Sequence, residues 1–181
     1  MARIVIVESK RVGELTRSLQ EETARGCALS GSAFLDEELR ETLQSYLVKS
    51  PKVERLLERL TFEFKTELAF ALGVLSPDEY QGLGIVRKIR NRFAHHSEVR
   101  DFSSDTKVVE GCKRLYDLKL VHEPPVDNRT IFMNAVAYLF FAIRDEMNST
   151  KPPEAKTDNF KTFDQRYSAR LNRSPKRSSL T

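Results

Sequence analysis

The sequence of 181 residues lacks several features that define whole classes of protein. It contains no tryptophan and no stretch of about 18 consecutive apolar residues, the length needed to cross a bilayer. Its start has only a short apolar stretch, Ile4 to Val7, without the longer apolar region and the small-residue cleavage site of a secretory signal. These absences predict a cytoplasmic protein that does not cross a membrane.

Cysteine is scarce, and the side chains that bind metals are not grouped. Cys27 and Cys112 match no metal or redox spacing, so we expect two buried thiols. His95 and His96 are adjacent, which points their side chains apart, and no carboxylate stands at zinc-protease spacing from them or from His122. A Ser/His/Asp elbow, a glycine-rich phosphate loop and a dinucleotide fingerprint are also missing. The sequence therefore predicts neither a metal ion nor a cofactor.

Excess basic charge is absent from most of the chain, although the net charge is +4 and the pI is about 9.1. From Lys151 onward the chain has eight basic and three acidic residues, so this stretch carries +5 and residues 1–150 carry −1. A nearly neutral body is not the electrostatic footprint of a dedicated duplex-DNA binder. We expect only weak, non-specific binding of nucleic acid, supplied by the cations of the tail.

The composition changes at the same point. Residues 151–181 are rich in Pro, Ser, Lys and Asn and poor in apolar residues, which is typical of disorder. The sequence therefore predicts one folded domain over residues 1–150 and a basic, disordered tail over residues 151–181. Four apolar tail residues are an exception, because their spacing of three or four suits a short docking helix: Phe160, Phe163, Tyr167 and Leu171.

Helix signals are abundant, and they predict an all-α single bundle of about six or seven helices. Apolar residues recur at helical spacing from Ala24 to Tyr46, where Gly31 and Ser32 would let a neighbouring helix approach closely. Ser50-Pro51 opens a further helix, and the run from Ser76 to Glu79 is a capping box with proline at the first helical position. No convincing pair of alternating strands is present.

The predicted helix ends and buried faces are specific. Gly73 is expected to end a helix that begins near Thr61, Ser103 or Ser104 to start a later one, and Asn128 to cap the last. The stretch from Arg3 to Val7 is ambiguous between a strand and a helix. The residues expected to be buried on the two helices after Ser50 are Leu56, Leu57 and Leu60 on the first, and Phe62, Leu68, Ala69 and Leu72 on the second.

The densest polar cluster lies between residues 87 and 96. An arginine and a histidine suit metal-free cleavage of RNA, because a histidine moves protons near neutral pH and an arginine stabilises the phosphorane. On one continuous helix Arg90 and His95 would lie about 140° apart. They act together only if the helix ends near Phe93 or a second subunit completes the site. The members of this candidate cluster are Arg87, Arg90, Asn91, Arg92, His95 and His96.

An architectural role explains the same residues, and we favour it. Cations in the last turn of a helix interact favourably with its terminal carbonyls and dipole. Arg90 is then expected to pair with a carboxylate such as Asp36 or Glu37, and Asn91 to tie the loop to a neighbouring helix.

The stretch from Leu68 to Val74, followed by Ser76-Pro77, is similar to the first helix and turn of a helix-turn-helix unit. The second helix of such a unit presents its N-terminus to DNA. Here that N-terminus carries Asp78 and Glu79, which phosphates repel, so we do not expect this unit to bind DNA.

Several ordered segments carry a family resemblance. These are Arg25 to Leu39, Phe64-Lys65 with Ala69 to Leu75, and Ile89 to His95. In this order, over roughly residues 20 to 145, the chain resembles the mannitol operon repressor family of bacterial all-helical proteins. The resemblance implies a repressor-type role in transcription regulation without a recognisable DNA-binding motif. A protein partner and self-association into a dimer or other homo-oligomer are expected.

The segment from Arg90 to His95 also resembles the Arg-x4-His motif of HEPN domains, helical and often dimeric, some of which are metal-independent ribonucleases. That resemblance implies that Arg90 holds the scissile phosphate, His95 is the general acid/base and Asn91 orients them. One HEPN subgroup has a tyrosine where this chain has Ser97. We expect a non-enzymatic regulator, with the HEPN-like ribonuclease and a plain protein-interaction module as alternatives.

Overall fold

The computed structural model describes residues 10–120 and 127–149, and over these residues it contains seven helices and no strand. This confirms the predicted all-α bundle. The stretch from Arg3 to Val7 and the tail from residue 151 lie outside the described residues. The helices are α1 (Lys10–Glu21), α2 (Ala24–Tyr46), α3 (Pro51–Arg59), α4 (Phe62–Ala71), α5 (Pro77–His95), α6 (Thr106–Asp117) and α7 (Asn128–Ser149).

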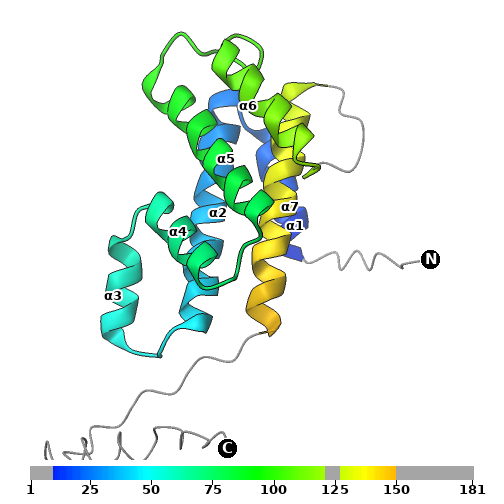
Figure 1. The fold of residues 1–181 in the computed structure, drawn as a ribbon. Helices are drawn as coiled ribbons and strands as arrows, with labels where there is room; N and C mark the ends of the chain where they lie inside the picture. The colour runs from blue at the N-terminus through cyan, green and yellow to red at the C-terminus, as the bar shows by residue number, and fades with distance from the viewer. Residues whose placement is uncertain (1–9, 121–126, 150–181) are drawn as a thin grey trace, which may run out of the picture.

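Two long helices, α2 and α7, form the centre of the bundle (Figure 1). The helix α1, which the sequence analysis missed, packs against both of them. On the other side α5 crosses α2, and α6 packs on α5 and α7. The two short helices lie at one edge, where α4 contacts α2 and α5 and α3 contacts α2.

Small residues allow α2 and α7 to approach closely, as predicted. A Cβ atom added to Gly31 would lie 3.3 Å from Cε1 of Phe132, so even alanine there would require the Phe132 ring to shift by a few tenths of an ångström. The hydroxyl of the buried Ser32 donates to the carbonyl of Ala28, one turn earlier, at 3.0 Å. Leu39, on the same helix, is fully buried in the core.

Polar side chains between α2 and α7 also make hydrogen bonds. Arg144 donates to both carboxylate oxygens of Glu38, at 2.8 and 3.0 Å, and the Glu38 side chain is only 3% exposed. Nearby, the Thr42 hydroxyl donates to the Ile143 carbonyl at 3.2 Å. Tyr46 donates to Glu146 at 3.0 Å, so the end of α2 lies beside the last turns of α7.

Caps define most helix starts where the sequence predicted them. The predicted capping box of Ser76 and Glu79 is present, and Gly73, with φ 77°, follows the end of α4. The predicted start of α6 is wrong, because its N-cap is Asp105, whose side chain accepts from Val108. Ser104 instead closes the preceding turn by donating to the Asp101 carbonyl at 2.9 Å.

The last helix also starts differently from the prediction. Asn128 is its first helical residue, and the Asp127 carboxylate accepts from the Thr130 N–H at 2.8 Å in the capping role. The Asn128 side chain donates to the Phe102 carbonyl at 3.2 Å instead.

Both cysteines are buried and free, as expected. Burial raises the pKa of the Cys112 thiol to about 12 and also raises the pKa of Cys27, so both stay protonated at neutral pH. Within the described part of the chain, no helix is long and apolar enough to cross a membrane.

The predicted buried faces of α3 and α4 are partly wrong. On α3 only Leu57 is buried, whereas Leu56 is 51% exposed. On α4 the buried residues include Lys65 and Thr66, while Leu72, which follows the helix, is 39% exposed. The reason is position: α3 lies at the edge of the bundle, so one side of this helix pair faces solvent.

Candidate functional site

The helix α5 carries the candidate cluster up to His95, and His96 is its C-cap. It runs without a break to His95, and the N–H of His96 donates to the Arg92 carbonyl at 3.1 Å. Arg90 and His95 therefore lie about 140° apart around this helix. The early helix end that would bring them together within one chain is absent from the described structure.

Arg90 faces α2 and α4. It is half-buried and lines a hollow of about 420 Å³ together with Ser32, Asp36 and Thr61. Asp36 accepts instead from the Nζ atom of Lys65 at 2.9 Å. Among the described residues, the Arg90 guanidinium makes no hydrogen bond or ion pair.

The predicted pairing of Arg90 with a carboxylate is therefore wrong for both candidates. Glu37 accepts from Arg40, three residues along the same helix, at 2.9 Å. The amine of Lys65, a 4% exposed lysine on α4, takes the position beside Asp36. Lysine reaches Asp36 because α4 packs on α2 through this face, which periodicity alone did not reveal.

Asn91 and Arg92 line a different hollow from Arg90. Together with Lys88 they line a hollow of about 390 Å³ between α5 and α6, which Lys107 and Arg114 border from α6. Glu110 is the one acidic residue among those that line this hollow in the described structure. Its lining is therefore mostly cationic.

His95 is exposed and lies seven residues after Lys88, on nearly the same helical face. The structure thus places Asn91, Arg92 and His95 along one side of α5. Arg90 is separated from all three.

Arg92 and His96 join α5 to α6. The Arg92 guanidinium contacts both carboxylate oxygens of Asp105, the N-cap of α6, and its Nη1 lies 2.7 Å from Nε2 of His96. The Nδ1 atom of His96 is 3.0 Å from the Glu98 carboxylate. The Arg92 hydrogen bond is the main reason that the pKa of Asp105 is below its usual range. These contacts support an architectural role for two members of the cluster.

An arginine from another helix holds the end of α5, and the sequence analysis did not identify it. Arg25 donates to the carbonyls of Phe93, of His96 at 3.1 Å and of Val99 at 3.4 Å. Phe93 is in the last turn of α5, and His96 and Val99 follow that helix, so Arg25 places a cation at its C-terminal end, where a cation is favourable. Arg25 lies in a segment that carries the family resemblance, but its target carbonyls lie 68 to 74 residues away, beyond any local signal.

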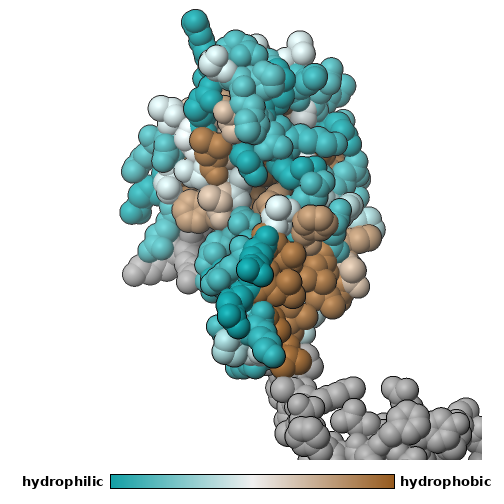
Figure 2. Space-filling model, turned by 90° about the vertical axis from the view of Figure 1, so that its left-hand side faces the viewer, coloured by the Kyte–Doolittle hydropathy of each residue, from teal (hydrophilic) through white to brown (hydrophobic). Residues whose placement is uncertain are grey.

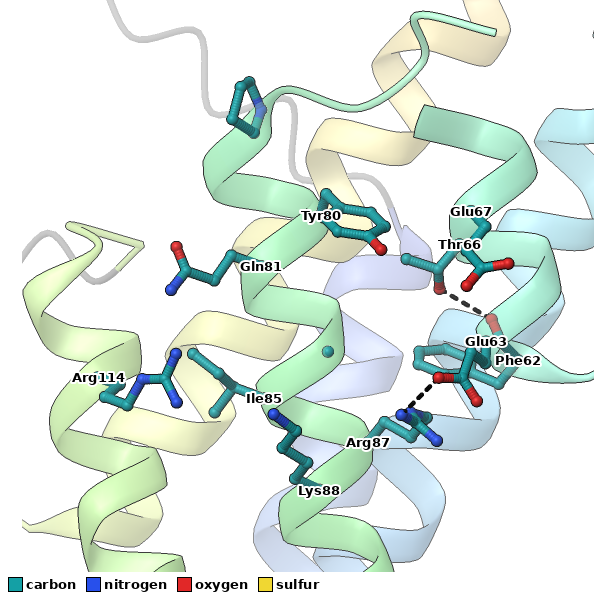
Figure 3. Close-up of a pocket in the computed structure, with 12 residues that line it drawn as sticks. Phe62, Glu63, Thr66, Glu67, Tyr80, Gln81, Ile85, Arg87, Lys88 and Arg114 are labelled. Carbon is teal, nitrogen blue, oxygen red and sulfur yellow. Dashed lines mark hydrogen bonds and ion pairs between the residues drawn. The ribbon is translucent and has the colours of Figure 1, made fainter. Parts of the chain in front are cut away.

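Arg87 belongs to a third hollow, of about 420 Å³, along α4, α5 and α6. Figure 3 shows its ion pair with Glu63 of α4, at 2.7 Å, on one side of α5. Lys88 of α5 and Arg114 of α6 lie on the other side. The space beside Gly84 is open, because a Cβ atom added there would meet no atom within 4 Å. The mixed charge of this hollow does not suit a polyanion.

Metal ligands do not converge in the described part of the chain, where no three His, Cys, Asp or Glu residues could hold an ion. His122 lies outside the described residues.

The helices of the suspected helix-turn-helix unit are present, but the second one is acidic where it would meet DNA. Asp78 is exposed in the first turn of α5. Tyr80, in the next turn, packs on Phe70 of α4 with ring centroids 4.7 Å apart.

A surface of exposed apolar residues extends over α3 and α4, and sequence periodicity assigned most of it to the core. We call it the α3–α4 stripe. Figure 2 shows an apolar area in the lower part of the molecule, where α3 and α4 lie in Figure 1. Phe64 is 58% exposed, the largest value among the exposed large apolar residues of the described chain. Its exposed members are Leu56, Phe64 and Leu72, and it includes the half-buried Leu60 and Leu68, which also pack against the core.

Comparison of the chain with protein-family models, with curated proteins and with solved structures returned no match.

Proposed function

We propose that this protein is a non-enzymatic, repressor-type regulator of transcription of the mannitol operon repressor kind, which acts in the cytoplasm through protein partners. The observation that carries the proposal is the α3–α4 stripe. Contiguous exposed apolar surface is costly in water and marks sites of protein association. The resemblance described above supplies the regulatory role, and the stripe supplies a surface suited to it.

Two further observations favour protein contacts over direct binding of DNA. The N-terminus of α5 carries Asp78 and Glu79, and residues 1–150 have a net charge of −1. Duplex DNA binding depends on neutralising phosphates with cations. The body of this chain therefore suits a protein partner that itself binds the operator.

The second candidate is the HEPN-like ribonuclease, and one observation favours it. Arg90 has no described partner and His95 is exposed, so both remain available to a substrate. Because α5 holds them on different faces, such a site requires a second subunit. In it Arg90 would hold the phosphate, His95 would move the proton and Asn91 would orient them.

A pull-down from native extract tests the regulatory proposal. The full chain serves as bait, with and without nuclease, beside the variant Phe64→Asp and a control, Phe141→Asp. Phe141 is 45% exposed but lies on α7, away from the stripe. We expect nuclease-resistant capture of a DNA-binding protein that Phe64→Asp abolishes and Phe141→Asp preserves. Capture that disappears with nuclease would contradict the proposal.

RNA cleavage in EDTA tests the second candidate. Arg90→Ala and His95→Ala remove side chains that lie outside described ion pairs, so each should change the free energy of unfolding by less than about 1 kcal/mol. We expect no cleavage of single-stranded RNA by the wild-type chain. Cleavage that both variants lose, with unchanged melting and a pH dependence near the histidine pKa, would establish the ribonuclease.

A further inference from the structure

We propose that the hollow along α4, α5 and α6 binds a peptide segment of a partner protein, one that carries a basic and an acidic side chain three residues apart. We call this hollow the α5 trough. It is lined by residues between Phe62 and Glu67 on α4, by residues between Pro77 and Lys88 on α5, and by Arg114 on α6 (Figure 3). The inference goes beyond the proposed function, because the α5 trough shares no residue with the α3–α4 stripe and its ligand needs no role in transcription.

The lining of the α5 trough includes a glycine that packing within the chain does not explain. Gly84 lies in the middle of α5, where glycine destabilises a helix relative to alanine. Close packing requires two other glycines of α5 and α6, because a Cβ atom on Gly82 would lie 2.5 Å from Leu120 and one on Gly111 would lie 2.9 Å from Ile89. A Cβ atom on Gly84 would meet no atom within 4 Å. The missing side chain at Gly84 therefore serves an occupant that approaches the backbone of α5 from outside.

The α5 trough has the size of a short peptide. Pro77 and Lys88 are eleven positions apart on α5, which corresponds to about 16 Å along the helix. The volume of about 420 Å³ is within the range of ligand-binding sites. Tyr80, which is 37% exposed, adds apolar surface to the lining.

The α4 side of the α5 trough is acidic. Arg87 already holds Glu63 at 2.7 Å. Glu67, one turn further along α4, is exposed and makes no ion pair with any described residue. Its carboxylate is therefore available to a cation of a ligand.

The α6 side of the α5 trough is cationic. Figure 3 shows the amine of Lys88 and the guanidinium of Arg114 pointing into the same space, beside Ile85. Both side chains are exposed, and neither makes a hydrogen bond or an ion pair with a described residue. Like charges that share one space repel each other, and an anion placed between them relieves this repulsion.

Opposite charges on the two sides of α5 select a dipolar ligand. The helices α4 and α6 each pack on α5, and the axes of packed helices are about 8–10 Å apart. A free amino acid is too short to reach both sides, because its ammonium and carboxylate groups are attached to one carbon. A polyanion would meet Glu67, and a polycation would meet Lys88 and Arg114. In an extended peptide, residues three positions apart are separated by about 10 Å, which matches the width of the site.

Titration of the full chain with short peptides, followed in two-dimensional amide NMR spectra, tests the proposal. The probes are acetyl-Arg-Ala-Ala-Glu-amide, the di-acidic acetyl-Glu-Ala-Ala-Glu-amide and the di-basic acetyl-Arg-Ala-Ala-Arg-amide. We expect the dipolar peptide to bind at millimolar concentration, at least about fivefold more tightly than the other two, because each of those places like charges together on one side. The amide signals that shift should belong to α5 around Gly84.

Substitution of Gly84 separates binding from folding. Gly84→Ala should raise the melting temperature by about 1–4 °C, because no atom opposes the added Cβ. Gly84→Leu places a larger side chain in the space that the peptide needs and should weaken binding at least about tenfold. Circular dichroism checks that both variants keep the helical fold.

Reversal of one charge should change which peptide binds. Glu67→Lys makes both sides of the α5 trough cationic, so the preference should move from the dipolar to the di-acidic peptide. Glu58→Lys is the matched control, because Glu58 is exposed on α3 and does not line the α5 trough. This control should keep the preference of the wild-type chain.

Three results would overturn the proposal. These are the absence of binding by the dipolar peptide at millimolar concentration, a wild-type preference for the di-acidic peptide, which would indicate a simple anion site, and binding that Gly84→Leu leaves unchanged. The pull-down with Phe64→Asp remains a separate test of the regulatory proposal, because Phe64 does not line the α5 trough.

Discussion

The contact between α2 and α7 and the stripe on α3 and α4 are built from similar residues but have opposite exposure. Both present leucine at helical spacing, yet Leu39 on α2 is fully buried and Leu56 on α3 is 51% exposed. Arginine–glutamate pairs differ in the same way. Arg144 holds a buried Glu38, whereas Arg40 holds a Glu37 that is 57% exposed.

The difference shows that the same amphipathic pattern serves two purposes. Where α1, α5 and α7 surround α2, an apolar residue becomes core. Where α3 lies at the edge, an apolar residue becomes surface that is available for association. The following predictions test this contrast, from the largest expected effect to the smallest.

Arg144→Ala should have the largest effect on stability. It removes both hydrogen bonds that the buried Glu38 carboxylate accepts from Arg144, and breaking a buried ion pair costs about 3–5 kcal/mol. Arg40→Ala, which breaks an exposed pair on the same helix as Glu38, should cost less than about 1 kcal/mol. Urea unfolding of both variants measures the two values, and equal losses would show that burial does not distinguish the two ion pairs.

Leu39→Ala and Leu56→Ala compare the same substitution in the two regions. At Leu39 the loss of buried surface and the cavity should cost about 2–5 kcal/mol. At Leu56 the cost should be below about 1 kcal/mol for a dilute chain. Urea unfolding of both variants measures the two values, and equal losses would show that Leu56 is packed as tightly as Leu39.

Asp105 should make stability depend on pH at the contact between α5 and α6. Because Arg92 holds the pKa of Asp105 below its usual range, folding gains stability that is complete above the unfolded pKa of about 3.9. That stability is lost as the pH falls through the lower pKa of the folded state. Asp105→Asn should flatten the pH dependence of unfolding below about pH 4. An unchanged slope would show that another carboxylate causes it.

Deletion of residues 151–181 should have the smallest effect. Every core residue of the described structure lies between Leu15 and Ile143, and the composition of the tail offers little apolar surface to offset chain entropy. The melting temperature should stay within a few degrees of the full-length value. A large decrease would show that the stretch from Phe160 to Leu171 packs on the body.

The tail should dominate any binding of duplex DNA. Its cations are expected to give weak affinity that falls steeply with salt and has little sequence preference. Salt-titrated binding of the full and the shortened chain measures this. Tight, sequence-selective binding by the shortened chain would instead support the helix-turn-helix interpretation of α4 and α5.

The sequence by itself determined the class of fold and most helix boundaries, because these depend on local chemistry. Apolar spacing predicted α2 from Ala24 to Tyr46, and the capping box at Ser76 predicted the start of α5. Caps satisfy backbone groups within three residues, so a local pattern is enough to find them. The start of α6 was missed because Ser103, Ser104 and Asp105 are all suitable caps, and the neighbouring turn uses Ser104.

Only the tertiary structure decided which residues meet and which face solvent. Local signals could not show that Lys65, rather than Arg90, reaches Asp36, or that Arg25 holds the end of α5. Those contacts join residues 29 to 74 positions apart, and they follow from how whole helices pack. The exposure of Leu56 has the same cause. Periodicity identifies an apolar face, but only the arrangement of the helices determines whether another element of the same chain covers it.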